Sequence, residues 1–188
     1  MNRILLAFAL LTLSSFAQSG PKDHLKPHTP ATQLTSSDPL SFERWFVGDW
    51  ICTGIQHDSP TAPPVRFIDR FRFRMALGDS WLMYRLNQVE GPHKGQLTLI
   101  GTITWDANAH LHVRRDMNIG GSRMDMTTPG WNGNSLVSTG YMVTGDQKLL
   151  AKHTLIRRGN DSYGATLEFT DPAGVPVGGE EADCKRTR

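Results

Sequence analysis

Hydrophobic and polar positions alternate with a period of two through most of the chain after residue 47. The clearest case is residues 65–75, where Phe67, Phe71 and Phe73 share one face and arginines occupy the other. Similar runs recur about every ten residues between turn-forming sequences, which is typical of antiparallel strands. The pattern predicts about ten strands, at residues 50–56, 65–75, 80–89, 96–105, 110–118, 122–128, 135–144, 148–158, 162–170 and 175–186.

A short helix is predicted just before these strands. Asp38 is a good N-cap residue, and Pro39 suits the first helical position. The apolar residues of the following turns are Leu40, Phe42, Trp45 and Phe46. We expect this helix to close one end of a barrel.

The spacing indicates a closed sheet. No helices are predicted between the strands, so a doubly wound α/β fold is not expected. A closed meander explains the even spacing and leaves no strand edges. If the first and last strands pair antiparallel, one register sets Cys52 against Cys184 and Trp50 against Arg186, because both pairs share the same sum of residue numbers. We therefore predict an all-β, antiparallel, closed up-and-down barrel over residues 38–188, with a disulfide at the seam and Arg186 on the Trp50 indole.

The N-terminal segment predicts export. Residues 1–17 combine a cationic start at Arg3, a short apolar run and small residues near Ala17, as a signal peptide does. Residues 18–37 are rich in Pro, Ser, Thr and Lys, which predicts a flexible leader. The apolar run is too short for an ordinary membrane span. We expect a periplasmic or secreted protein without membrane insertion after cleavage, in which the two cysteines form one disulfide.

Composition narrows the function. Twenty Lys and Arg residues nearly balance eighteen Asp and Glu residues, which argues against nucleic acid as a partner. The chain contains no Gly-x-Ser-x-Gly elbow, no phosphate-binding loop and no His-Glu-x-x-His motif. We expect a protein that is not an enzyme and needs no cofactor, while the oligomeric state stays open.

The inward strand faces supply the candidate ligand-binding residues. The large apolar candidates for lining an interior cavity are Phe71, Phe73, Trp81, Met83 and Trp105. The same side chains could simply fill a core, so both interpretations stay open. Asp69 is a polar exception on the aromatic face of its strand, and it either orients a ligand or pairs internally with an arginine such as Arg85 or Arg115.

Histidines offer a second kind of chemistry. His153 shares a face with Leu149, Ala151 and Leu155, which suits either a hydrogen-bonded core residue or an axial haem ligand. His110 and His112 fall on one face of their predicted strand with the spacing of a zinc site, although Leu111 and Val113 suggest that both histidines face solvent.

A third interpretation concerns the outer surface. Four arginines alternate along residues 65–75 opposite the aromatic face. They form either a solvated outer face or a docking stripe for an acidic partner. These residues are Arg66, Arg70, Arg72 and Arg74.

The motif Gly48-Asp49-Trp50 resembles the Gly-x-Trp signature of lipocalins and other calycin barrels, in which a late arginine packs on the tryptophan, as Arg186 would here. With the preceding helix and the final strand, the chain resembles an exported bacterial family of unknown function with a lipocalin-like fold. This resemblance implies a barrel and carries no catalytic residue. The chain is also distantly similar to nitrobindin, a ten-stranded haem-binding barrel, which makes His153 the candidate haem ligand. Our principal hypothesis is a non-catalytic barrel that binds a small hydrophobic molecule, and the alternative is a haem or metal protein.

Overall fold

A computed structural model describes residues 39–187, so the expected signal peptide, leader and Asp38 cap lie outside the described residues. The helices among these residues are the α-helix α1 (Ser41–Phe46) and the short 3-10 helix η1 (Ile119–Gly121), and most other residues lie in strands joined by turns. Neither helix in this part of the chain is long and apolar enough to cross a bilayer. The strands are β1 (Gly48–His57), β2 (Val65–Ala76), β3 (Trp81–Glu90), β4 (Leu97–Asp106), β5 (Leu111–Asn118), β6 (Arg123–Thr128), β7 (Trp131–Asn132), β8 (Ser135–Thr144), β9 (Gln147–Arg157), β10 (Ser162–Thr170) and β11 (Pro176–Thr187).

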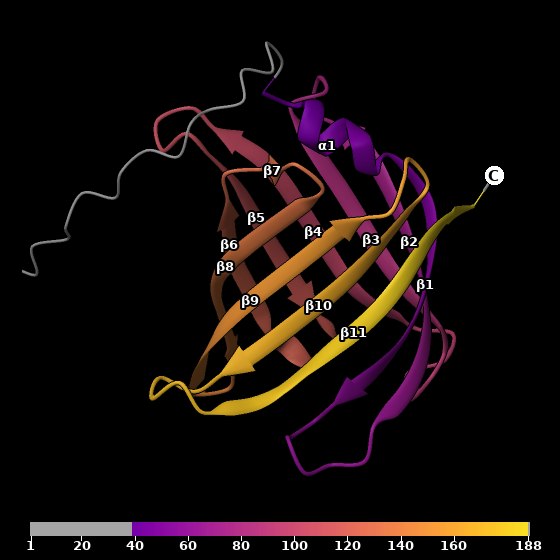
Figure 1. Ribbon diagram of the computed structural model, residues 1–188, viewed down its shortest axis with the longest axis vertical. Helices are drawn as coiled ribbons and strands as arrows, with labels where there is room; N and C mark the ends of the chain where they lie inside the picture. The colour runs from indigo at the N-terminus through magenta and orange to yellow at the C-terminus, as the bar shows by residue number, and fades with distance from the viewer. Residues whose placement is uncertain (1–38, 188) are drawn as a thin grey trace, which may run out of the picture. The chain divides into compact units, whose positions relative to one another are not determined.

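Ten of these strands form a closed antiparallel barrel (Figure 1). Neighbours in sequence pair from β1 to β6 and from β8 to β11, and the ring is completed by the β6–β8 and β1–β11 pairs. The two-residue strand β7 is additional and pairs only with the start of β8. The predicted fold class is therefore confirmed. The additional strand β7 was not predicted, because two residues are too few to show a period-two pattern.

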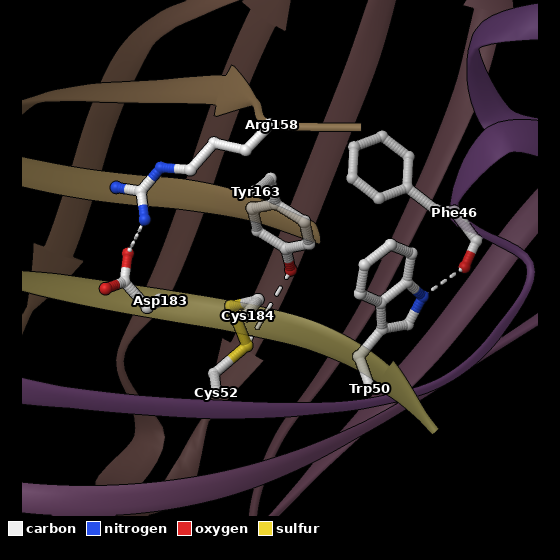
Figure 2. The surroundings of a disulfide bond; sticks show 7 residues. All are labelled: Phe46, Trp50, Cys52, Arg158, Tyr163, Asp183 and Cys184. Atoms are coloured by element: carbon white, nitrogen blue, oxygen red, sulfur yellow. Dashed lines mark hydrogen bonds and ion pairs between the residues drawn. A yellow bond between two sulfur atoms is a disulfide. The ribbon is translucent and has the colours of Figure 1, made fainter. Parts of the chain in front are cut away.

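The seam between β1 and β11 has the predicted register. Cys52 lies opposite Cys184, and Trp50 lies opposite Arg186. The two cysteine sulfur atoms are at bonding distance, 1.98 Å, and the disulfide links positions 132 residues apart (Figure 2). The guanidinium carbon of Arg186 lies 4.3 Å from the centre of the Trp50 ring, in a cation–π contact.

Helix α1 covers one end of the barrel (Figure 1) and buries Phe42 and Phe46. The Trp50 indole nitrogen donates a hydrogen bond to the Phe46 carbonyl at 2.7 Å, as Figure 2 shows. Arg186 ties the helix to the last strand by donating to the carbonyls of Trp45, at 2.7 Å, and Val47.

The helix starts later than predicted. The first helical hydrogen bond runs from the Arg44 amide to the Leu40 carbonyl, so Leu40 takes the N-cap position. Pro39 lies in the preceding turn, and its expected place as the first helical residue is wrong.

The alternation of phenylalanine and arginine along β2 shows which face of this strand points into the barrel. Phe67 and Phe73 are buried on the inward face, while the four arginines of the outward face are exposed. Two of these arginines, Arg72 and Arg74, pair with Asp49 on β1 at 3.2 and 2.9 Å. Exposed pairs of this kind contribute little stability.

Candidate functional site

The barrel encloses a cavity of about 450 Å³. This volume falls within the range of about 300–1,000 Å³ that is usual for small-molecule sites. Every strand of the ten-stranded ring contributes to its wall, and Phe42 and Phe46 of α1 close it from the helix-covered end. The aromatic part of the wall also includes Phe67, Phe71 and Phe73 of β2.

A buried polar cluster interrupts the apolar wall at Arg114 of β5. Its guanidinium donates to the Asp116 carboxylate, with Nε and Nη2 at 2.8 and 2.6 Å from Oδ2. The Tyr84 hydroxyl donates to the other oxygen of Asp116. Gly101 of β4 leaves room for this contact, because a Cβ there would overlap both Tyr84 and Asp116. Burial lowers the pKa of Arg114, but its charge interactions and hydrogen bonds with Asp116 and Tyr84 together outweigh burial and raise the pKa, so the guanidinium stays charged.

His153 of β9 joins this cluster. Arg114 Nη1 lies 2.7 Å from His153 Nδ1, and because a guanidinium has no acceptor, Nδ1 must accept this hydrogen bond. Burial, followed by the Arg114 charge, lowers the pKa of His153 well below its usual value. The imidazole is therefore neutral and carries its proton on Nε2.

A second polar region contains Asp69 of β2 and Glu180 of β11. Asp69 is 7 % exposed, and its Oδ1 accepts a long hydrogen bond of 3.4 Å from Gln88 Nε2. Burial, followed by the charge of Glu180, raises the pKa of Asp69 to about 7. Burial also raises the pKa of Glu180, although the charge of Arg114 opposes that rise. These two carboxyl groups therefore retain protons more readily than ordinary ones.

The disulfide itself forms part of the cavity wall. Tyr163 of β10 is buried, and its hydroxyl oxygen lies 3.8 Å from Cys52 Sγ (Figure 2). Sulfur is a weak acceptor, so this hydroxyl keeps hydrogen-bonding capacity on the wall. Burial raises the pKa of Tyr163, and the group remains protonated.

The structure brings together four of the predicted ligand-binding residues. Phe71, Phe73, Asp69 and His153 all line the cavity. The expected pairing of Asp69 with an arginine is wrong, because Arg85 is exposed on the outer face of β3 and Arg115 pairs with Asp125 at 3.5 Å.

The remaining three predicted residues do not line the cavity. Met83 is 42 % exposed, and Trp81 shares its outward face of β3, so their expected place on the cavity wall is wrong. Trp105 has the inward orientation but lies beyond the cavity, with its ring 4.9 Å from that of His112. On β3 the inward residues are instead Leu82, Tyr84, Leu86 and Gln88.

The expected solvent-facing histidine pair is also wrong. His112 is 4 % exposed, and its Nδ1 lies 2.7 Å from Glu43 Oε1 of α1. His110 lies in the turn before β5, with a left-handed φ of 53°. The two residues therefore do not share a strand face, and His112 fastens the helix to the barrel end.

Sequence reasoning missed several polar residues of the cavity. Glu180 could have been found, because it lies four residues before Cys184 on the same strand and so shares its inward face. Arg114 lies on the same face of β5 as His112. Because this face was predicted to point to solvent, Arg114 was not recognised as a cavity residue. Tyr84 and Gln88 lie on β3, where the opposite face of the strand was predicted to point inward.

A closed ten-stranded antiparallel barrel with an internal cavity is a calycin-like fold. No protein-family model matches the chain, and no curated protein sequence matches it. The solved structure of Rv2717c from M. tuberculosis is similar, with a TM-score of 0.63 and 14% sequence identity, over 80% of this chain and 98% of that chain.

A protein of unknown function from the DUF3598 family of Nostoc punctiforme is also similar, with a TM-score of 0.55 and 10% identity. That match covers 77% of this chain and 49% of the other, so this chain spans about half the length of that protein. Identities this low show a shared fold alone.

Proposed function

We propose that the protein is a non-catalytic binding barrel that holds a small, mainly hydrophobic molecule in its interior. The observation that carries the proposal is the cavity of about 450 Å³, whose wall combines aromatic and aliphatic side chains with clusters of polar groups. Such a site buries the apolar body of a ligand and uses its polar groups for orientation. The solved structures with this fold are compatible with a binding role.

The proposed setting is an exported compartment, periplasmic or extracellular. The support is the Cys52–Cys184 pair, which joins the first and last strands of the barrel. Disulfides persist in oxidising environments and are rare in the cytosol. The signal-peptide pattern of residues 1–17 agrees with this setting.

The geometry of His153 does not suit the haem alternative. A histidine that ligates a metal through one ring nitrogen usually donates its other N–H to a carboxylate or carbonyl. Here the other nitrogen, Nδ1, accepts a hydrogen bond from Arg114, which leaves the proton on Nε2. His110 and His112 do not offer a paired metal site either. Of the two, only His112 lies on β5, and its Nδ1 already contacts Glu43.

Cavity occupancy is tested with a pair of adjacent residues on β8. Ser138 is buried and lines the cavity, whereas Val137 beside it is 40 % exposed on the outer face. Ser138→Phe fills the cavity and Val137→Phe leaves it unchanged. We expect Ser138→Phe to weaken binding of the fluorescent apolar probe N-phenyl-1-naphthylamine by about tenfold or more, and Val137→Phe to change it by less than about twofold.

Native mass spectrometry of protein from an exporting host provides the complementary measurement, together with an absorbance scan. Excess mass that leaves on denaturation, without a Soret band, is the expected result. A Soret band, or an equal response of both Phe variants to the probe, would contradict the proposed function.

A further inference from the structure

The charge on the cavity wall is not balanced. Its charged side chains, histidines aside, are the carboxylates Asp58, Asp69 and Glu180 and a single guanidinium, Arg114. Arg114 already forms an ion pair with Asp116, whose side chain has no exposed surface. Among residues 39–187, neither Asp69 nor Glu180 takes part in a direct ion pair with a cationic side chain. Asp58 is exposed, just beyond the end of β1, so the wall has two inward carboxyl groups without a cationic partner, Asp69 and Glu180.

Buried carboxylates without a cation are costly, because burial removes their hydration. Among the described residues, the Asp69 side chain has only the 3.4 Å hydrogen bond that Oδ1 accepts from the Gln88 amide. The side chain of Glu180, a partly buried residue, has no hydrogen bond among the described residues and also lines the cavity. A cation that entered the cavity would meet two acceptors whose negative charge is uncompensated.

The surroundings of Asp69 favour an organic cation over a metal ion. Phe67 and Phe71 lie two residues to either side of Asp69 on the same inward face of β2, and both line the cavity. Aromatic faces attract alkylammonium groups and bury the attached carbon chain, whereas a metal ion needs several hard oxygen ligands. Within the described residues, no group of three or more His, Cys, Asp or Glu side chains could hold a metal ion.

We infer that the cavity selects an apolar molecule that carries a protonated amine, with the amine beside Asp69 and Glu180 and the apolar body against the β2 phenylalanines. The inference rests on the proposed binding function and adds the chemical class of the ligand. His153 Nε2–H and the Tyr163 hydroxyl, on the same wall, are donors available to an acceptor elsewhere on that molecule.

Three probes of matched shape test this inference: 4-phenylbutylamine, 4-phenylbutanol and 4-phenylbutyrate. They share the apolar body and differ in carrying a cation, a neutral hydroxyl or an anion. Calorimetric titration of the oxidised protein at pH 8 compares them, because an alkylammonium is still protonated there. We expect the amine to bind about tenfold tighter than the alcohol, and the carboxylate to bind more weakly than both, because charge-assisted hydrogen bonds are stronger than neutral ones.

Two isosteric variants locate the amine. Asp69→Asn and Glu180→Gln should each reduce binding of 4-phenylbutylamine by about tenfold, while binding of 4-phenylbutanol changes by less than about threefold. Glu168→Gln is the matched control, since Glu168 is half exposed and pairs with Lys152 at 3.1 Å. It should leave the affinity for all three probes unchanged.

The outcomes separate the two proposals. If 4-phenylbutanol binds but the amine binds no more tightly, or if both cavity variants leave the amine affinity unchanged, the amine inference is overturned while the binding barrel stands. If none of the three probes nor N-phenyl-1-naphthylamine binds, both proposals fail. Should one variant not fold, the probe series on the unsubstituted protein and the other variant still decide the question.

Discussion

Buried charged side chains have different partners at the helix-covered end of the barrel and on the wall that carries Asp69. At the helix end, Glu43 contacts His112, and Arg186 lies on the Trp50 ring. The guanidinium carbon of Arg157 contacts two indoles, at 4.4 Å from the centre of the Trp45 ring and 3.8 Å from that of the Trp131 ring. On the cavity wall, Asp69 has only an amide as partner.

This difference separates structural polar groups from those that a ligand could use. A charge with a protein partner of defined geometry stabilises the fold. At the helix end this holds for the Glu43 oxygen that contacts His112, although Glu43 Oε2, Trp131 Nε1 and Arg157 Nε have no hydrogen-bond partner among the described residues. A carboxyl group that faces a cavity without a cation costs stability, and a complementary ligand would remove that cost. The helix-covered end is therefore a structural closure, and the Asp69 region is the part of the interior suited to recognition.

The largest expected effect comes from breaking the helix-covered end at Trp50, which has no exposed surface. Trp50→Ala removes the hydrogen bond to Phe46 and the ring under Arg186, and it should lower the free energy of unfolding by about 4 kcal/mol. Urea unfolding of the oxidised protein measures the change. Met83→Ala, on the outer face, should cost less than about 1 kcal/mol. Similar losses in the two variants would show that the indole contributes no special packing.

A smaller effect should follow from neutralising the helix carboxylate. Glu43→Gln keeps the side-chain size but loses the charge-assisted hydrogen bond to His112, which should lower the free energy of unfolding by about 2 kcal/mol. The exposed carboxylate Glu168 offers the control, and Glu168→Gln should cost less than about 0.5 kcal/mol. If Glu43→Gln is as stable as the control, the Glu43–His112 contact does not hold the helix in place.

The smallest effect, with the opposite sign, is expected at Asp69. Its pKa is raised to about 7 in the folded protein, so between about pH 4 and pH 7 the folded chain keeps a proton that the unfolded chain has lost. The free energy of unfolding therefore falls as the pH rises through this interval. Asp69→Asn removes the decrease and should stabilise the protein at pH 8 by about 1 kcal/mol, after allowance for water in the cavity.

The gain should be smaller at pH 5, where the wild-type carboxyl is largely protonated, and urea unfolding at both pH values measures it. Glu180, which raises the pKa of Asp69 by its charge, remains in the variant. Equal effects of Asp69→Asn at pH 5 and pH 8 would mean that the carboxyl titrates normally.

Most of the fold could be predicted because its signals are local. On β2, phenylalanine and arginine alternate strictly, so the period alone assigns Phe73 to the interior and Arg72 to solvent. The seam register could be predicted from residue numbers. Once Cys52 is set against Cys184, antiparallel pairing also sets Trp50 against Arg186.

The site was harder to predict because its signals are long-range. Residues 81–84 of β3 are large and apolar on both faces, so alternation could not decide that Tyr84 faces inward and Met83 outward. The face of His112 depends on a carboxylate from α1, 69 residues earlier, which no local pattern around β5 reveals. Inward charges such as Arg114 are recognised only once their partners are known.

The position of the disulfide also affects the order of events during folding. The β1–β11 ladder joins segments separated by 132 residues at Cys52 and Cys184, and contacts of such high sequence separation form slowly because the loop must close first. In the oxidised unfolded chain this closure is already made, and the two seam strands remain neighbours. The oxidised chain therefore begins refolding with its most distant strand pair in proximity, whereas the reduced chain must find that pair by a diffusive search.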